Sequence, residues 1–112
     1  MVHPNLTSDE NKVIAELKEV IKKLVDDRLM IFSLYGSKAK GDYDSKSDTD
    51  IAIIVRGLSR EQKKHIYNVI ADIEVKYFTP LSVLLLSDKD FESLKKKERR
   101  IAIDIEKNGI PL

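Results

Sequence analysis

Two aspartates, Asp48 and Asp50, are separated by one threonine and lead directly into the apolar residues 51–55. Aspartate is disfavoured in strands, so a strand that begins with two of them needs a physical reason. If both residues start the strand, its period-two geometry sends their carboxylates to one face, with Cα atoms roughly 6.5 to 7 Å apart. At about 5 Å between charges and an effective dielectric near 20, their repulsion is on the order of 3 kcal/mol. We therefore expect a cation between them.

The residue types present restrict which cation this is. Hard divalent cations take carboxylate oxygens, and Mg²⁺ is commonly held by one or two carboxylates together with substrate phosphates. The chain has no cysteine, and His3 and His65 have no ligand-like spacing, so a thiolate zinc site is excluded. Asp48 and Asp50 are thus candidate ligands for Mg²⁺, with Mn²⁺ as an alternative. The competing interpretation is structural: Asp48 caps a turn and Asp50 meets solvent at a strand end.

A second polar segment begins at Gly36, directly after the apolar residues 29–35. Gly36 permits a tight turn and a close approach of the backbone to a ligand. Ser37 adds a hydroxyl, and the residues after it can open a short helix whose free N–H groups attract phosphate. Lys38 and Lys40 raise the local positive potential. Taken alone, this segment is equally compatible with a plain turn from a strand to a helix.

The remaining sequence predicts helices that alternate with strands. Apolar residues at three- and four-residue spacing predict a helix over 13–29, with a capping box formed by Thr7 and Glu10. Ser59 begins a second helix that ends before Pro80, and Ser87 begins a last one that ends at Gly109. Short apolar runs predict strands at 29–35, 51–55 and 81–86. We expect one α/β domain over residues 1–112 with a small sheet.

Composition narrows the function classes only slightly. With 42% hydrophobic and 35% charged residues the chain can pack a core, and its net charge of +1 gives no global attraction to nucleic acid or membrane. No apolar run approaches membrane-spanning length and no signal sequence is visible, so a cytoplasmic protein without a membrane partner is expected. The basic run from Lys95 to Arg100 is typical of a solvated helix face, and contact with RNA is the alternative.

The two polar segments together form a recognisable motif. Gly36-Ser37, ten intervening residues and Asp48-Thr49-Asp50, with Gly41-Asp42 and Ser47 in between, resemble the minimal nucleotidyltransferases of the DNA polymerase beta-like superfamily. The resemblance covers nearly the whole chain. It implies an α/β (α+β) fold, with a small mixed sheet and helices packed mainly on one face.

The resemblance also implies roles for these residues. Gly36 and Ser37, with Lys38 and Lys40 beside them, would hold a nucleoside triphosphate, ATP in the first instance. Asp48 and Asp50 would be the catalytic residues and bind Mg²⁺ or Mn²⁺. The reaction implied is in-line attack of a protein or RNA hydroxyl on the α-phosphate, with pyrophosphate leaving.

Two features qualify that expectation. Fully active members of the family carry a third carboxylate on a neighbouring strand, and the corresponding residues 81–86 contain no acid. At 112 residues the chain also lacks room for the helical domain that encloses the nucleotide in larger relatives. A small helical HEPN-type protein, as in a toxin-antitoxin pair, or a second copy would supply that wall. The alternative to an enzyme is a catalytically impaired module that binds a nucleotide or a toxin and acts by contact.

Overall fold

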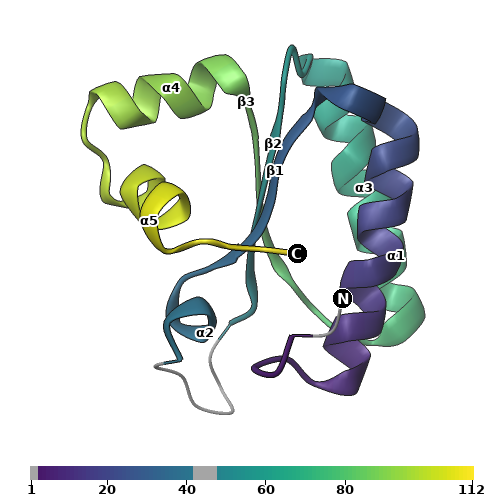
Figure 1. The fold of residues 1–112 in the computed structure, drawn as a ribbon. Helices are drawn as coiled ribbons and strands as arrows, with labels where there is room; N and C mark the ends of the chain where they lie inside the picture. Colours follow the sequence, from purple (N-terminus) through teal and green to yellow (C-terminus); the bar gives the residue numbers. More distant parts are fainter. Residues whose placement is uncertain (1–2, 42–47) are drawn as a thin grey trace.

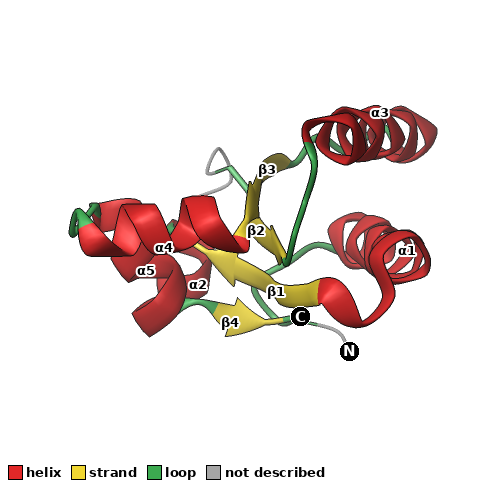
Figure 2. Cartoon of the chain, turned by 90° about the horizontal axis from the view of Figure 1, so that it is seen from above, coloured by secondary structure: helices red, strands yellow, loops and turns green. Residues whose placement is uncertain are grey.

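The computed structural model describes residues 3–41 and 48–112, which form a mixed sheet between two layers of helices (Figures 1 and 2). The elements in chain order are α1 (Ser8–Val25), a 3-10 turn η1 (Asp26–Arg28), β1 (Leu29–Tyr35), α2 (Ser37–Lys40), β2 (Asp50–Val55), α3 (Arg60–Tyr77), β3 (Ser82–Ser87), α4 (Asp88–Lys96), α5 (Arg100–Asn108) and β4 (Ile110–Pro111). None of the helices in the described residues has the length and apolar content needed to cross a membrane.

The sheet has the strand order β3-β2-β1-β4. β1 runs antiparallel to both β2 and β4, whereas β2 and β3 are parallel and are connected through α3. The mixed α/β sheet expected from the sequence is thus confirmed. The topology brings the end of β1 beside the beginnings of β2 and β3, so that both polar segments lie at one end of the sheet.

The two long helices cover one face of the sheet and close the larger core (Figure 2). Both begin with capping boxes: Thr7 pairs with Glu10, as predicted, and Ser59, the predicted start of the second helix, pairs with Gln62. Their apolar stripes pack on alternate, buried residues of β1 and β2. The longest helices lie on this face, but α4 and α5 cover the opposite one, so helices pack on both faces rather than mainly on one.

A second and smaller core lies on the opposite face, under α4 and α5. The sequence predicted a single helix over this stretch, and that prediction is wrong: the chain turns at residues 97–99, where Glu98 adopts a φ of 53°. An α-helix of L-residues does not continue through a left-handed residue, so the conformation of Glu98 ends the helical run. The turn folds Ala102 and Ile105 back beside Phe91.

Candidate active site

Gly36 forms the turn between β1 and α2. Its backbone has φ 74° and ψ −155°, a region that essentially only glycine populates. A Cβ at this position would lie 2.5 Å from Oδ2 of Asp50. The missing side chain therefore lets the turn approach the carboxylate closely, and the two predicted segments are in contact through this pair.

Asp50 is the first residue of β2 and lies between two other strands. It pairs with Tyr35 on antiparallel β1 and with Ser82 on parallel β3. Residues paired across a sheet present their side chains on the same face. By alternation this is the face of Ala52 and Ile54, which α4 and α5 cover farther along the strand. The Ser82 side chain is thus next to the Asp50 carboxylate, and hydrogen bonding with it lowers the pKa of Asp50.

The surroundings of Asp50 leave its negative charge undercompensated. Burial raises its pKa and the charge of Asp48 raises it further, which outweighs the lowering by the Ser82 hydrogen bond and by Lys38. Asp48 itself is exposed just before the strand. Burial and the Asp50 charge also raise the pKa of the Tyr35 phenol. Burial and a neighbouring carboxylate both disfavour the charged form of Asp50, and a bound cation would offset that cost.

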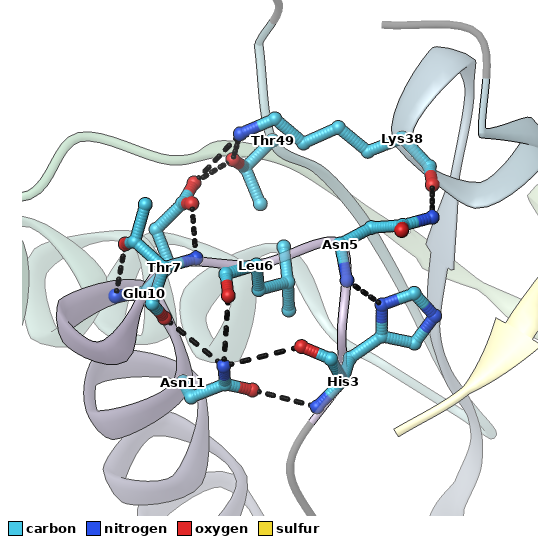
Figure 3. Close-up of polar contacts among 8 residues, drawn as sticks. All are labelled: His3, Asn5, Leu6, Thr7, Glu10, Asn11, Lys38 and Thr49. Atoms are coloured by element: carbon cyan, nitrogen blue, oxygen red, sulfur yellow. Dashed lines mark hydrogen bonds and ion pairs between the residues drawn. The ribbon is translucent and has the colours of Figure 1, made fainter. Parts of the chain in front are cut away.

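Thr49 lies between the two aspartates, and its side chain takes part in a different set of contacts (Figure 3). Its hydroxyl donates to Oε2 of Glu10 and accepts from Nζ of Lys38 at 2.6 Å. Nζ of Lys38 also lies 2.9 Å from the same Glu10 oxygen. All three residues are buried. Burial alone would raise the pKa of Glu10, but hydrogen bonds from Thr49, the Thr7 N–H and Lys38 hold it at about 2.

The predicted nucleotide-binding residues differ in their availability. Ser37 is the first residue of α2, the short helix predicted after Gly36, and it is half-buried. The Lys40 side chain is 42% exposed and pairs with Asp104 at 3.4 Å. The Lys38 ammonium, by contrast, points into the protein and is bound by Glu10 and Thr49. Asp42 and Ser47, which belong to the predicted motif, lie outside the described residues.

The donor set fits a divalent cation shared with phosphate groups. In residues 3–41 and 48–112 no group of three or more His, Cys, Asp or Glu side chains is placed to hold a metal ion. Asp48 and Asp50 would supply one or two carboxylates, and a nucleotide's phosphates would complete the coordination. The position beside Asp50 on β3 holds Ser82, a hydroxyl in place of a third acid.

Sequence reasoning missed Ser82, Thr49 and the second role of Glu10. The period-two pattern offered a signal for Thr49, since a residue between two side chains on one face must point to the other. Ser82 depends on the register between β2 and β3, which no local pattern encodes. Glu10 was visible only as a capping residue.

Comparisons with known proteins show the family to which the chain belongs. The family model described as "Polymerase beta, Nucleotidyltransferase" matches residues 15–112. A curated protein of Methanocaldococcus jannaschii, named "Putative protein adenylyltransferase MJ0141", is 32% identical over 75 residues, which cover 66% of this chain and 76% of that protein.

A solved structure described as "a putative nucleotidyltransferase from Sulfolobus solfataricus" covers 97% of this chain and 90% of its own, at 16% identity and a TM-score of 0.41. The family assignment depends on the matched model and on the M. jannaschii relative. The chain therefore belongs to the polymerase beta-like nucleotidyltransferases and resembles their minimal members.

Proposed function

We propose that this protein transfers AMP from ATP to a hydroxyl group of another protein, with Mg²⁺ or Mn²⁺ held by Asp48 and Asp50. The observation that carries the proposal is the approach of the Gly36 turn to the Asp50 carboxylate, where a single Cβ would reach within 2.5 Å. A phosphate group on this turn would lie beside the carboxylates and would need a cation between them. The name of the M. jannaschii relative supports a protein acceptor and an adenylyl group.

The reaction balances without a further reactant. The acceptor oxygen forms a bond to the α-phosphorus, the bond from that phosphorus to the bridging oxygen breaks, and pyrophosphate leaves while the hydroxyl proton passes to solvent. A bound divalent cation would neutralise the negative charge that develops on the phosphate oxygens. Gly36 and Ser37 would position the triphosphate, and Lys40 would add positive potential at its edge.

The proposed acceptor is a small helical protein of the HEPN type, with RNA or a second copy of the chain as other partners. Asp48 is exposed at the end of the sheet where β2 begins. A partner that encloses this end would exclude water and bring its hydroxyl to the nucleotide. The need for ATP and Mg²⁺ keeps the cytoplasm as the proposed location.

Transfer is tested by incubating the pure protein with ATP labelled on its α-phosphate, Mg²⁺ and the helical partner. We expect the label on the partner, and we expect Asp48→Ala/Asp50→Ala to lose it. The matched control is Asp72→Ala/Asp90→Ala, which removes the same two negative charges from exposed positions on α3 and α4. Label that persists in the first variant, or no label with any of the four nucleotides, would refute the proposal.

A second candidate function is a module that binds its partner and no longer catalyses. The observation favouring it is Ser82, which fills the position next to Asp50 on β3 with a neutral side chain. This candidate predicts that Asp48→Ala/Asp50→Ala still inhibits the partner, whereas the enzyme predicts that inhibition disappears. Assays of the partner's own activity with each variant separate the two.

A further inference from the structure

The buried network of Glu10, Lys38 and Thr49 joins three parts of the chain behind the proposed metal site. Glu10 lies in the first turn of α1, Lys38 in α2 and Thr49 directly before β2. From these contacts we infer that Glu10 and Lys38 are positioning residues, which act through Thr49 to hold Asp48 and Asp50 beside the Gly36 turn. The inference rests on the proposed function, since it concerns the same site.

Each atom of the network has a defined partner. Oε1 of Glu10 accepts from the Thr7 N–H at 3.0 Å, which fixes the carboxylate to the start of α1. Oε2 is left for the Thr49 hydroxyl and for the Lys38 ammonium, the latter at 2.9 Å. The Thr49 hydroxyl donates to Oε2 of Glu10 and accepts from the Lys38 ammonium. Charged hydrogen bonds of this kind, removed from water, are the strongest available to side chains.

The network connects the two halves of the motif. Lys38 is the second residue after Gly36, and Thr49 is the residue before Asp50, so their 2.6 Å contact ties the turn to the start of β2. On the far side, the Thr49 carbonyl accepts from the Ser82 N–H at 2.9 Å, which fixes the start of β3. Any shift of Thr49 therefore moves Asp48 and Asp50 relative to both neighbouring strands.

A direct role in nucleotide binding does not suit the Lys38 ammonium. Its side chain is only 10% exposed, and its ammonium hydrogen bonds with Glu10 and Thr49. The Lys38 carbonyl also accepts from the Asn5 side chain at 2.8 Å, so its backbone is held as well (Figure 3). Contact with a phosphate would require breaking a buried ion pair. The electrostatic effect of Lys38 still reaches Asp50, whose pKa it lowers.

Thr49→Val is the sharpest test because it removes the hydroxyl and keeps the shape. The ion pair, both aspartates and the Gly36 turn remain in place. We expect Mn²⁺ affinity, measured by titration and electron paramagnetic resonance, and AMP transfer each to fall about 10- to 100-fold, as for other residues that orient metal ligands. The KM for the acceptor should not change. Thr49→Ser, which retains the hydroxyl, should recover most of both.

The double variant Glu10→Gln/Lys38→Met removes the ion pair without leaving a single buried charge. Glutamine still caps α1, and methionine fills the space of the lysine stem. We expect the same loss of Mn²⁺ affinity as in Thr49→Val. The matched control is Glu106→Gln/Lys95→Met, which removes an ion pair of equal length between α4 and α5. It should leave Mn²⁺ affinity unchanged.

Metal-free protein gives an independent measurement. Hydrogen exchange of the Ser82 N–H, whose acceptor is the Thr49 carbonyl, should accelerate in Thr49→Val and remain slow in Thr49→Ser. All assays are made well below the thermal midpoint of each variant. A role limited to stability would lower the midpoint while the folded variants bind Mn²⁺ normally, and that result would overturn the inference.

The experiment also separates the inference from the proposed function. If the wild-type protein binds no Mn²⁺ and transfers no AMP, the proposed function fails whatever the variants do, and the inference fails with it. If wild type binds and transfers and both network variants match it, the inference alone fails.

Discussion

The two faces of the sheet differ sharply at the point where β2 begins. On the α1 face, Thr49, Glu10 and Lys38 are buried, hydrogen-bonded and electrically balanced. On the opposite face, Asp50 lies beside the charge of Asp48, and burial and that charge raise its pKa despite the neighbouring Ser82 hydroxyl. Three consecutive residues thus serve two purposes, because alternation sends their side chains to opposite sides.

The comparison shows how a small domain can keep two like charges together. The face with Glu10, Lys38 and Thr49, here called the balanced face, fixes the backbone. The face with Asp48 and Asp50, the unbalanced face, is left with a charge that a cation can neutralise. Substitutions on each face test this division of roles, and the largest effect is expected on the face that contributes most to stability.

Lys38→Met should have the largest effect on stability. It leaves the Glu10 carboxylate buried without its cation, and breaking a buried pair in this way costs about 3–5 kcal/mol. Urea titration of both proteins measures the free energy of unfolding. Lys76→Met is the control: its ion pair with Glu16 has the same 2.9 Å length, but the lysine is 61% exposed. Exposed pairs contribute little, so equal losses in the two variants would contradict the assignment of a buried structural pair.

Acid should weaken the balanced face in a defined pH range. The pKa of Glu10 is about 2 in the folded protein against an ordinary 4.5, so its contribution is complete above pH 4.5 and is lost as the pH falls towards 2. That difference corresponds to about 3 kcal/mol. We expect the free energy of unfolding of wild type to fall by about this amount more than that of Glu10→Gln between pH 5 and 2. Parallel pH profiles for the two proteins would disprove it.

Gly36→Ala should damage the unbalanced face while leaving both aspartates chemically intact. The new Cβ meets Oδ2 of Asp50 at 2.5 Å, so the carboxylate must move. Backbone strain adds about 1–3 kcal/mol, and Mn²⁺ affinity should fall because Asp50 is displaced. Gly57→Ala is the matched control, since φ there is 66° but nothing lies within 4 Å. It should lose stability in urea and keep its metal affinity; a loss of affinity in both variants would trace the effect to strain alone.

Local signals predicted most of the fold and placed Gly36, Asp48 and Asp50 together in one candidate site. Both capping boxes are where Thr7 and Ser59 indicated them, because a side chain three residues away decides a helix start. The Gly36 turn and the aspartates at the start of β2 follow from residue types alone. They share one end of the sheet because β1 and β2 are antiparallel neighbours, so the end of one strand lies beside the start of the other.

The contacts of the balanced face could not be predicted because they depend on packing between distant parts of the chain. The sequence alone indicates that Lys38 is a free cation. In the fold, α1 places Glu10, 28 residues away, in contact with it. Asp50 and Ser82 meet only through the register of two parallel strands. The break at Glu98 was missed since apolar spacing continues on both sides of it, and the left-handed residue is a glutamate rather than the glycine that usually marks such a turn.

Ser82→Asp should strengthen metal binding at the unbalanced face. Its expected effect is the smallest of the four predicted effects. It adds a third carboxylate directly beside Asp50 on the same face of the sheet. Because ligand charge tunes the affinity of hard cations, Mn²⁺ should bind about tenfold more tightly, or by about 1.4 kcal/mol. Without metal the added repulsion should lower the thermal midpoint.

Ser82→Asn is the control for this variant, as it has the size of aspartate and no charge. Equal Mn²⁺ affinity in the two variants would show that position 82 does not face the metal site. If Ser82→Asp also raises AMP transfer, the hydroxyl on β3 limits catalysis in the natural chain. The same scaffold would then bind a nucleotide with two carboxylates and transfer AMP faster with three, which makes the neutral residue at position 82 the difference between the two candidate functions.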